Sequence, residues 1–412
     1  MNTLKPKTAT YEAHPGEVKK VVLLFSGGLD TSIILKWINI HYNAEVITLT
    51  LDLGQPGIDL VDVKKKALAL GAVKAIVVDA KEEFAEHYIA KAIKANALYQ
   101  GQYPLSTTIG RPLICKYAVK VAEEEGCDAV AHGSTGKGND QVRLDAGIIT
   151  LNPKLKVLAP VRDYDLTRDV EADFAKKHGI PIAHHKVSQY STDENLWGRS
   201  IECGILEHPE EPFPDDIFTL TTIPEKAPDI PDIISLQFEH GVPVGMNNVP
   251  MMLHVLVDNL NKIAGKHGVG IIDMVEDRVV GLKSREIYEC PAAITIINAH
   301  KDLEKFTSTI HQNSVKPFID QRWSEMAYYG LWNDPLMDSL NAFIDTMNSQ
   351  VTGEVKVKLF KGAAIPTSRS SKNAIYDHQL ASYTKGQTFN QAASPGFIEL
   401  WSLQTKMANQ RG

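Results

Sequence analysis

The sequence predicts an α/β fold, with a doubly wound parallel-sheet domain, a second domain of α+β type and a C-terminal helix. Three observations favour this class. Short apolar runs alternate with helix-length amphipathic stretches from residue 19 to about residue 185, which is typical of βαβ units. The apolar runs are hydrophobic on both faces, as expected where helices cover both sides of a sheet. A Pro-rich acidic stretch, residues 208–232, then leads into a mixture of strand-like and helical patterns.

In the first domain, predicted strands and predicted helices alternate over most of the length. Helix-boundary residues support the limits, since Asp59 and Thr167 are suitable N-caps and Gly71, Gly126 and Gly179 stand where helices end. The strands are expected at residues 21–25, 45–51, 74–80, 128–133 and 156–161, and the helices at residues 31–41, 59–70, 81–98, 111–125 and 167–178. A doubly wound domain binds its ligand beyond the carboxyl ends of these strands.

The second domain is expected to mix strands and helices. Strands are predicted at residues 233–244, 279–283, 292–298, 354–360 and 364–368, and helices at residues 251–265, 302–312 and 317–349. The predicted segments of the whole chain are therefore a flexible lead at residues 1–18, the first domain at 19–185, the second domain at 186–385 and a C-terminal arm at 386–412.

The C-terminal arm is predicted to end in an amphipathic helix. Ser394 is a suitable N-cap and Pro395 a suitable first helical residue. An apolar stripe follows, formed by Phe397, Leu400, Trp401 and Met407. Such a helix either docks on its own core or reaches a neighbouring subunit, and the pattern leaves both readings open.

Composition excludes several classes of protein. Of 412 residues, 43% are hydrophobic and 23% are charged, so disorder of the whole chain is excluded. The 43 basic and 50 acidic residues give a net charge of −7, which argues against nucleic acid as the main partner. No run approaches the ~20 apolar residues needed to cross a bilayer. We therefore expect no membrane partner.

Cysteine use and the N-terminal residues favour a cytoplasmic protein. Cys115, Cys127, Cys203 and Cys290 are scattered without C-x-x-C spacing, so we expect reduced thiols and no structural zinc site. The lead lacks the apolar segment of a secretory signal. Its lysines and threonines only faintly suggest a transit peptide, against which its glutamates and lack of arginine count. The histidines, including the pair at residues 184–185, show no metal-ligand spacing.

The segment Ser26-Gly27-Gly28-Leu29-Asp30-Thr31-Ser32 joins a predicted strand to a predicted helix. Such a junction presents unpaired backbone N–H groups at the positive end of the helix dipole, and its hydroxyls can donate to phosphate oxygens. The carboxylate of Asp30 would repel phosphates unless a cation such as Mg²⁺ bridged them. A tight turn with an N-cap is the alternative reading. Neither a Walker A motif nor G-x-G-x-x-G occurs, so kinase and dehydrogenase readings lack their signatures.

The Ser26–Ser32 segment resembles the pyrophosphate-binding loop of ATP pyrophosphatases, the adenine nucleotide alpha hydrolase-like fold. Further segments resemble the argininosuccinate synthase family, in colinear order from about residue 19 to beyond residue 400. They are the glycine-rich segment 132–143 and the segments 103–108, 111–112, 190–202, 264–270 and 283–289.

This resemblance implies a two-step ligase reaction of arginine biosynthesis. Citrulline attacks the α-phosphate of ATP to give citrullyl-adenylate and diphosphate, and the amine of aspartate then displaces AMP to give argininosuccinate. Such a reaction depends on positioning and charge stabilisation, so no residue is singled out as nucleophile or base. The resemblance also implies Mg²⁺ with ATP and a homotetramer.

The resemblance further implies three sets of binding residues. The ATP set is Leu24, Phe25, Ser26, Gly27, Gly28, Leu29, Asp30, Thr31, Ser32, Leu51, Ala131, His132, Gly133 and Lys137. The citrulline set is Tyr103, Thr108, Asn139, Arg143, Ser191, Ser200, Glu276 and Tyr288, and the aspartate set is Thr135, Asn139 and Asp140. Taken singly, each residue has a structural alternative: the tyrosines could be core aromatics, and Glu276 a surface charge.

Two other kinds of function stay open. One is a different pyrophosphate-loop enzyme, such as a tRNA-modifying thiolase or an amidotransferase synthetase, although paired cysteines and a glutaminase domain are not evident. The other is a catalytically inactive nucleotide sensor or scaffold, although the motifs stand intact. The lead departs from the family pattern, in which the chain usually begins close to the first strand, and we expect it to be disordered.

Overall fold

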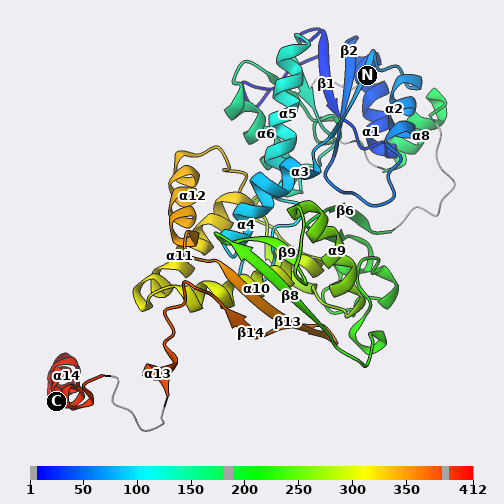
Figure 1. Ribbon diagram of the computed structural model, residues 1–412. Helices are drawn as coiled ribbons and strands as arrows, with labels where there is room; N and C mark the ends of the chain where they lie inside the picture. Colours follow the sequence, from blue (N-terminus) through cyan, green and yellow to red (C-terminus); the bar gives the residue numbers. More distant parts are fainter. Residues whose placement is uncertain (1–6, 165, 167, 181–188, 383–388, 412) are drawn as a thin grey trace.

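The computed structural model describes residues 7–164, 166, 168–180, 189–382 and 389–411. Within them, a parallel sheet flanked by helices forms the first domain, and two antiparallel sheets with helices packed around them form the second (Figure 1). The segment at the C-terminal end lies apart from both. The α/β class, with a doubly wound first domain and an α+β second domain, is therefore confirmed.

The first sheet has the strand order β3-β2-β1-β4-β5, and all its pairings are parallel. Its strands are β1 (Lys20–Leu24), β2 (Glu45–Asp52), β3 (Lys74–Asp79), β4 (Ala129–Ala131) and β5 (Lys156–Leu158). From β1 the chain adds β2 and β3 on one side, and it then adds β4 and β5 on the other side. The direction of strand addition therefore reverses between β1 and β4. That reversal opens a crevice beyond the carboxyl ends of these two strands.

Alternate residues of β1 serve the two faces of this sheet. Val21 and Leu23 pack in the core under α1 (Leu29–Trp37) and α2 (Leu60–Ala69), whereas Val22 packs in the core under α5 (Gly110–Glu124) and α6 (Asn139–Leu151). Further helical segments are η1 (Ile38–Tyr42), α3 (Lys81–Phe84), η2 (Ala85–Ile89), α4 (Ala90–Lys94), α7 (Pro160–Asp163) and α8 (Arg168–His178). The prediction that helices cover both faces is confirmed.

Most predicted helix boundaries of the first domain are correct. The Asp59 side chain accepts hydrogen bonds from two backbone amides of α2, and Gly71, Gly126 and Gly179 all have positive φ. Thr167 lies outside the described residues. The strands predicted at 128–133 and 156–161 are shorter, because β4 ends at Ala131 and Pro160 starts α7.

The N-terminal lead differs from the prediction. Residues 10–12 run beside β5 at the edge of the sheet, where Glu12 forms a parallel bridge with Val157. Ala13 and Val18 are 8% and 2% exposed and belong to the core around β1. The prediction of a disordered lead is therefore wrong for residues 7–18, because these apolar side chains find a place on the first domain.

The second domain contains two antiparallel sheets. One has the order β10-β9-β8-β13-β14 and the other β11-β12-β7-β6. The strands are β6 (Ser191–Asn195), β7 (Gly198–Glu202), β8 (Asp232–Glu239), β9 (Val242–Met246), β10 (Val249–Pro250), β11 (Ile271–Asp277), β12 (Lys283–Glu289), β13 (Gly353–Phe360) and β14 (Ala363–Ser370). Single-turn helices η3 (Gly204–Glu207), η4 (Asp215–Ile217) and η5 (Pro224–Lys226) punctuate the Pro-rich connector.

Two predicted strands of the second domain are wrong. Residues 292–298 belong to α10 (Pro291–Thr307), whose side chains are buried almost all round, so their apolar run imitates a strand. Residues 279–283 mostly form the turn between β11 and β12. The other helices are α9 (Leu253–Lys266), α11 (Ile310–Tyr328), which contains Pro317, and α12 (Pro335–Asn348). Because α11 runs through residues 313–316, the predicted break between two helices at these residues is wrong.

The C-terminal segment comprises α13 (His378–Ala381), η6 (Gln391–Ala393), α14 (Ser394–Trp401) and α15 (Leu403–Asn409). Ser394 is the first helical residue, so the predicted N-cap is one residue too late. Phe397, Leu400 and Trp401 are 61%, 70% and 78% exposed, so their stripe is not covered by the described part of the chain. None of the described helices is long and apolar enough to cross a bilayer.

Candidate functional site

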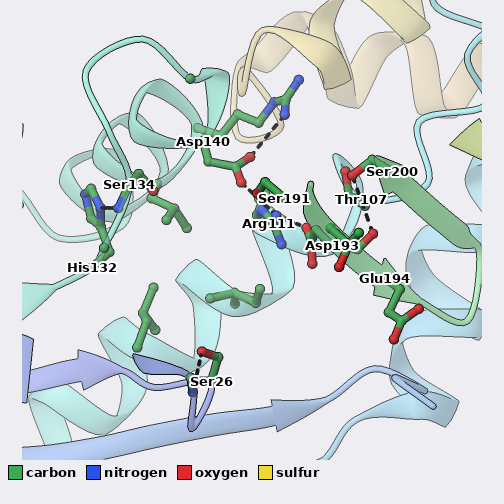
Figure 2. Close-up of a pocket in the computed structure, with 18 of the residues that line it drawn as sticks. Ser26, Thr107, Arg111, His132, Ser134, Asp140, Ser191, Asp193, Glu194 and Ser200 are labelled. Carbon is green, nitrogen blue, oxygen red and sulfur yellow. Dashed lines mark hydrogen bonds and ion pairs between the residues drawn. The ribbon is translucent and has the colours of Figure 1, made fainter. Parts of the chain in front are cut away.

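A cavity of about 670 Å³ lies between the carboxyl ends of the first sheet and the β6–β7–β12–β11 sheet of the second domain. It brings together residues that are distant in sequence (Figure 2). The predicted site residues that line it are Leu24, Phe25, Ser26, Gly28, Leu29, Asp30, Thr31, Leu51, Tyr103, His132, Gly133, Thr135, Asn139, Asp140, Arg143, Ser191, Ser200, Glu276 and Tyr288.

The Ser26–Ser32 loop forms one end of the cavity. Gly27 has φ of +81°, and a Cβ there would lie 2.9 Å from Val63 Cγ2, so the tight turn requires glycine. Ser26 Oγ accepts from the Gly28 amide at 3.3 Å. No side chain caps α1 at Gly28, which leaves amides of its first turn available to an anion. The Lys66 ammonium donates to the Gly27 carbonyl at 2.5 Å and adds positive charge behind the loop.

Five predicted residues do not line the cavity. Gly27 and Ser32 shape the loop from behind, and the Ser32 hydroxyl donates to the Gly28 carbonyl at 2.6 Å. Ala131 is fully buried in β4. Lys137 is exposed, and Thr108 is buried with its hydroxyl 3.3 Å from the Tyr103 hydroxyl. Their roles as binding residues stay predictions.

The glycine-rich loop, residues 132–138, forms a second wall. His132 Nδ1 accepts from the Ser134 amide at 3.2 Å, as Figure 2 shows. The Gln141 side chain, on α6, donates to the Gly136 carbonyl at 2.5 Å. Thr135 is exposed at the cavity rim, where its hydroxyl can reach a ligand.

Two guanidinium groups flank Asp140. Its Oδ2 is 2.7 Å from Arg111 Nη2, and its Oδ1 is 3.1 Å from Arg143 Nη1. Arg111 also pairs with Asp193 of β6 (Figure 2). Burial alone would raise the pKa of Asp140, but the two guanidinium groups outweigh it and hold that pKa well below its usual range. Asp140 is therefore ionised and can receive an ammonium or amine.

Glu276 is the centre of a buried polar cluster. Its Oε2 accepts from the Tyr288 hydroxyl at 2.6 Å, and its Oε1 accepts from the Tyr328 hydroxyl at 2.5 Å. Burial raises the pKa of Glu276, although hydrogen bonds from both tyrosines lower it in part. Asn139 donates to the Tyr328 hydroxyl at 2.8 Å and accepts from the Val279 amide at 2.8 Å. The cluster therefore presents a hydrogen-bonded carboxyl group to the cavity.

Arg143 lies beside this cluster. Its guanidinium stacks over the Tyr328 ring, with 4.7 Å between the guanidinium carbon and the ring centre, and its Nε donates to the Tyr328 carbonyl at 2.9 Å. Its buried Nη2 has no hydrogen-bond partner among the described residues. A buried donor of this kind favours an anionic ligand such as a carboxylate.

Sequence reasoning missed several lining or supporting residues. Arg278 pairs with both Glu202 and Glu286, and burial followed by repulsion from Glu202 and Glu276 raises the pKa of Glu286 to about 8. Glu286 and Arg111 lie within the segments 283–289 and 111–112 that resemble the family. A charged residue inside such a segment is the signal that could have identified them as site residues. Tyr328 lies on α11, far from any motif, and carries no such signal.

Among the described residues, no three histidine, cysteine or acidic side chains converge on a metal position. No disulfide joins the four cysteines, and burial raises the pKa of Cys115 and Cys290 to about 12. These two do not supply a thiolate nucleophile.

Family models cover nearly the whole chain. "Arginosuccinate synthase N-terminal HUP domain" matches residues 20–181, and "Arginosuccinate synthase C-terminal domain" matches residues 190–408. A solved 4-thiouridine synthetase–RNA complex with bound ATP aligns with 39% of this chain and 41% of its own, at 18% identity and a TM-score of 0.30.

Curated relatives agree with the family models. An argininosuccinate synthase of Pyrococcus furiosus is 53% identical over 94% of this chain and 94% of its own. One of Oceanobacillus iheyensis is 52% identical over 94% and 93%, and one of Lacticaseibacillus paracasei is 49% identical over 95% and 97%. The chain therefore belongs to the argininosuccinate synthase family of C–N bond-forming ligases.

Proposed function

We propose that the cavity holds ATP, citrulline and aspartate together and forms argininosuccinate, AMP and diphosphate. One observation carries the proposal: the phosphate-loop turn and the Glu276 cluster open into the same cavity. The ureido oxygen of citrulline would attack the α-phosphate to release diphosphate. The aspartate amine would then attack the activated carbon, and AMP would leave with the oxygen.

The ATP end is the part of the cavity formed by the first domain. The free amides of α1 and the hydroxyls of Ser26 and Thr31 suit the phosphates. Leu24 and Leu51 offer apolar surface to the adenine ring. Mg²⁺ bound to the phosphates would offset their charge, and Asp30, exposed on the first turn of α1, would lie beside it.

The citrulline end is formed by α6 and the second domain. Glu276, with its two tyrosine donors, suits the α-ammonium group, and the unpartnered Nη2 of Arg143 suits the α-carboxylate. Ser191 and Ser200 add hydroxyls from the β6–β7 hairpin. Tyr103 stacks on Tyr288, with ring centres 3.9 Å apart, and completes this wall.

The aspartate subsite would lie between these two ends. Asp140, kept ionised by Arg111 and Arg143, can accept from the aspartate ammonium. Thr135 at the rim and Asn139, the first residue of α6, both precede Asp140 in the chain and line the same cavity. The aspartate amine would then be held beside the activated carbon of citrullyl-adenylate, where it can add to that carbon before AMP leaves.

The test is diphosphate release from ATP, measured with and without citrulline and aspartate. Citrulline-dependent diphosphate, followed by AMP and argininosuccinate in equal amounts once aspartate is added, supports both half-reactions. Release that ignores citrulline, or ADP as the product, overturns the proposal. The alternative pyrophosphate-loop enzymes would then be tested with amide and tRNA acceptors.

We also propose a cytoplasmic homotetramer. The exposed stripe of α14 and α15, including Trp401 and Met407, has no cover in the described chain, and a second copy would provide it. The lack of a disulfide among the four cysteines is consistent with a reducing compartment. Light scattering of the full chain distinguishes a tetramer from a monomer of 45.5 kDa, and the latter contradicts the assembly.

A further inference from the structure

The lead docks on the first domain through its backbone. The Val157 amide donates to the Tyr11 carbonyl at 2.9 Å, and the Lys156 ammonium donates to the Thr10 carbonyl at 2.7 Å. These two bonds fix the backbone on either side of the Tyr11 side chain. That side chain turns toward α6, where it packs partly buried against the core.

The Tyr11 hydroxyl donates to Asp145 Oδ2 at 3.1 Å. Asp145 is 5% exposed, and its Oδ1 lies 2.7 Å from His132 Nε2. Because His132 Nδ1 accepts from the Ser134 amide, the imidazole carries its proton on Nε2 and donates it to Asp145. A continuous chain of hydrogen bonds thus joins the lead to the first residues of the glycine-rich loop.

A second branch leaves the same carboxylate. Asp145 Oδ2 accepts from Arg162 Nη1 at 2.7 Å, and the same nitrogen lies 3.2 Å from Gln141 Oε1. Gln141 in turn holds the Gly136 carbonyl. Both the beginning and the middle of the loop therefore depend on the orientation of the Asp145 carboxylate. Tyr11 and Arg162 both donate to the same oxygen of that carboxylate, Oδ2.

We propose that Tyr11 is a positioning residue for the nucleotide: through Asp145 it holds the glycine-rich loop in the shape that faces ATP. This inference rests on the proposed function, since that function assigns the loop to ATP. It gives the lead a task in the reaction, although no atom of the described lead lines the cavity. Its effect is expected on ATP, and not on citrulline, whose residues lie outside both branches.

The test compares Tyr11→Phe with Tyr42→Phe in the full chain. Tyr42 is a matched control, because its hydroxyl also contacts the lead, at the Ala13 carbonyl 3.4 Å away, but lies in neither branch. For Tyr11→Phe, we expect the KM for ATP to rise about three- to tenfold, the equivalent of one hydrogen bond, with the KM for citrulline unchanged. For Tyr42→Phe, we expect both values to stay within about twofold of the parent.

Hydrogen exchange of the ligand-free proteins supplies a readout independent of activity. Peptides covering residues 132–138 should exchange faster in Tyr11→Phe and unchanged in Tyr42→Phe. Equal exchange in all three proteins overturns the inference, as does a KM for ATP that stays at the parent value or rises together with that for citrulline. If the parent protein does not release citrulline-dependent diphosphate, the proposed function is rejected. Faster exchange in Tyr11→Phe would in that case still show that Tyr11 supports the glycine-rich loop.

A double substitution guards against a purely structural effect. Asp145→Asn should itself raise the KM for ATP, and adding Tyr11→Phe should then have less effect than in the parent, because both act through one carboxylate. Fully additive effects would contradict the shared path. Where a variant does not fold, the exchange and KM measurements on the other single variant decide the question.

Discussion

Gly330→Ala should disturb the citrulline end of the cavity without touching any substrate. Gly330 follows α11 with φ of +77°, and a Cβ there would lie 2.8 Å from Arg143 Cα and 3.2 Å from its Cγ. Because the nearest atom belongs to the backbone of α6, a rotamer change cannot relieve the contact. Either the loop after α11 or the helix that carries Arg143 must move.

The magnitude follows from two costs. A left-handed conformation at a non-glycine residue costs about 1–2 kcal/mol. Forcing a methyl group into a packed contact adds about 1–3 kcal/mol. Gly126→Ala is the matched control, since Gly126 also follows a helix with φ of +61° but has no atom within 4 Å of the added Cβ. Only the second cost separates the two variants.

The assay measures the unfolding midpoint in urea and the KM for each substrate. We expect both variants to lose stability, Gly330→Ala by more, and only Gly330→Ala to raise the KM for citrulline, by about tenfold for ~1.4 kcal/mol of lost binding. The KM for ATP should change little in either. Equal midpoints for the two variants, or a parent-like KM for citrulline in Gly330→Ala, would refute the reasoning.

Three further substitutions test the site. Asp30→Asn should reduce diphosphate release strongly while leaving the thermal midpoint nearly unchanged, and unaltered turnover would remove Asp30 from the site. Glu276→Gln should raise the KM for citrulline by about tenfold or more, because a charge-assisted bond is lost, with ATP binding by calorimetry as the control. Glu286→Gln should alter the pH dependence of stability. The folded chain keeps the Glu286 proton up to about pH 8, whereas its ordinary pKa is 4.5, so stability falls as pH rises through that window. The variant's advantage in thermal midpoint should therefore grow from pH 5 to pH 8, and parallel curves would contradict it.

The parts of the fold that depend only on residues adjacent in the sequence could be predicted from it. A buried strand, two glycines and a helix N-terminus follow one another directly in the Ser26–Ser32 loop, so its geometry is a local property. The same holds for the Asp59 cap. Residues 292–298 show the limit: a helix buried on nearly all sides carries no periodic polar face, and its apolar run cannot be distinguished from a strand.

The supporting residues of the site could not be predicted in this way. Tyr328 contacts Asn139 across 189 positions of sequence, and Arg111 contacts Asp193 across 82. Such partners are fixed by the packing of whole domains. The β6–β7 hairpin was missed because its residues, polar on both faces, lack the alternation that signals a strand.

The bonds joining Asn139 of α6 to Tyr328 and thence to Glu276 cross from one domain to the other. If the chain were cut between its domains, each half would bear buried polar groups whose partners reside on the other half, at a cost to both. The site therefore lies at the interface between the two domains, and neither domain forms it alone. A ligand bound at this interface stabilises the folded state of both domains, so its binding makes them behave as one cooperative unit.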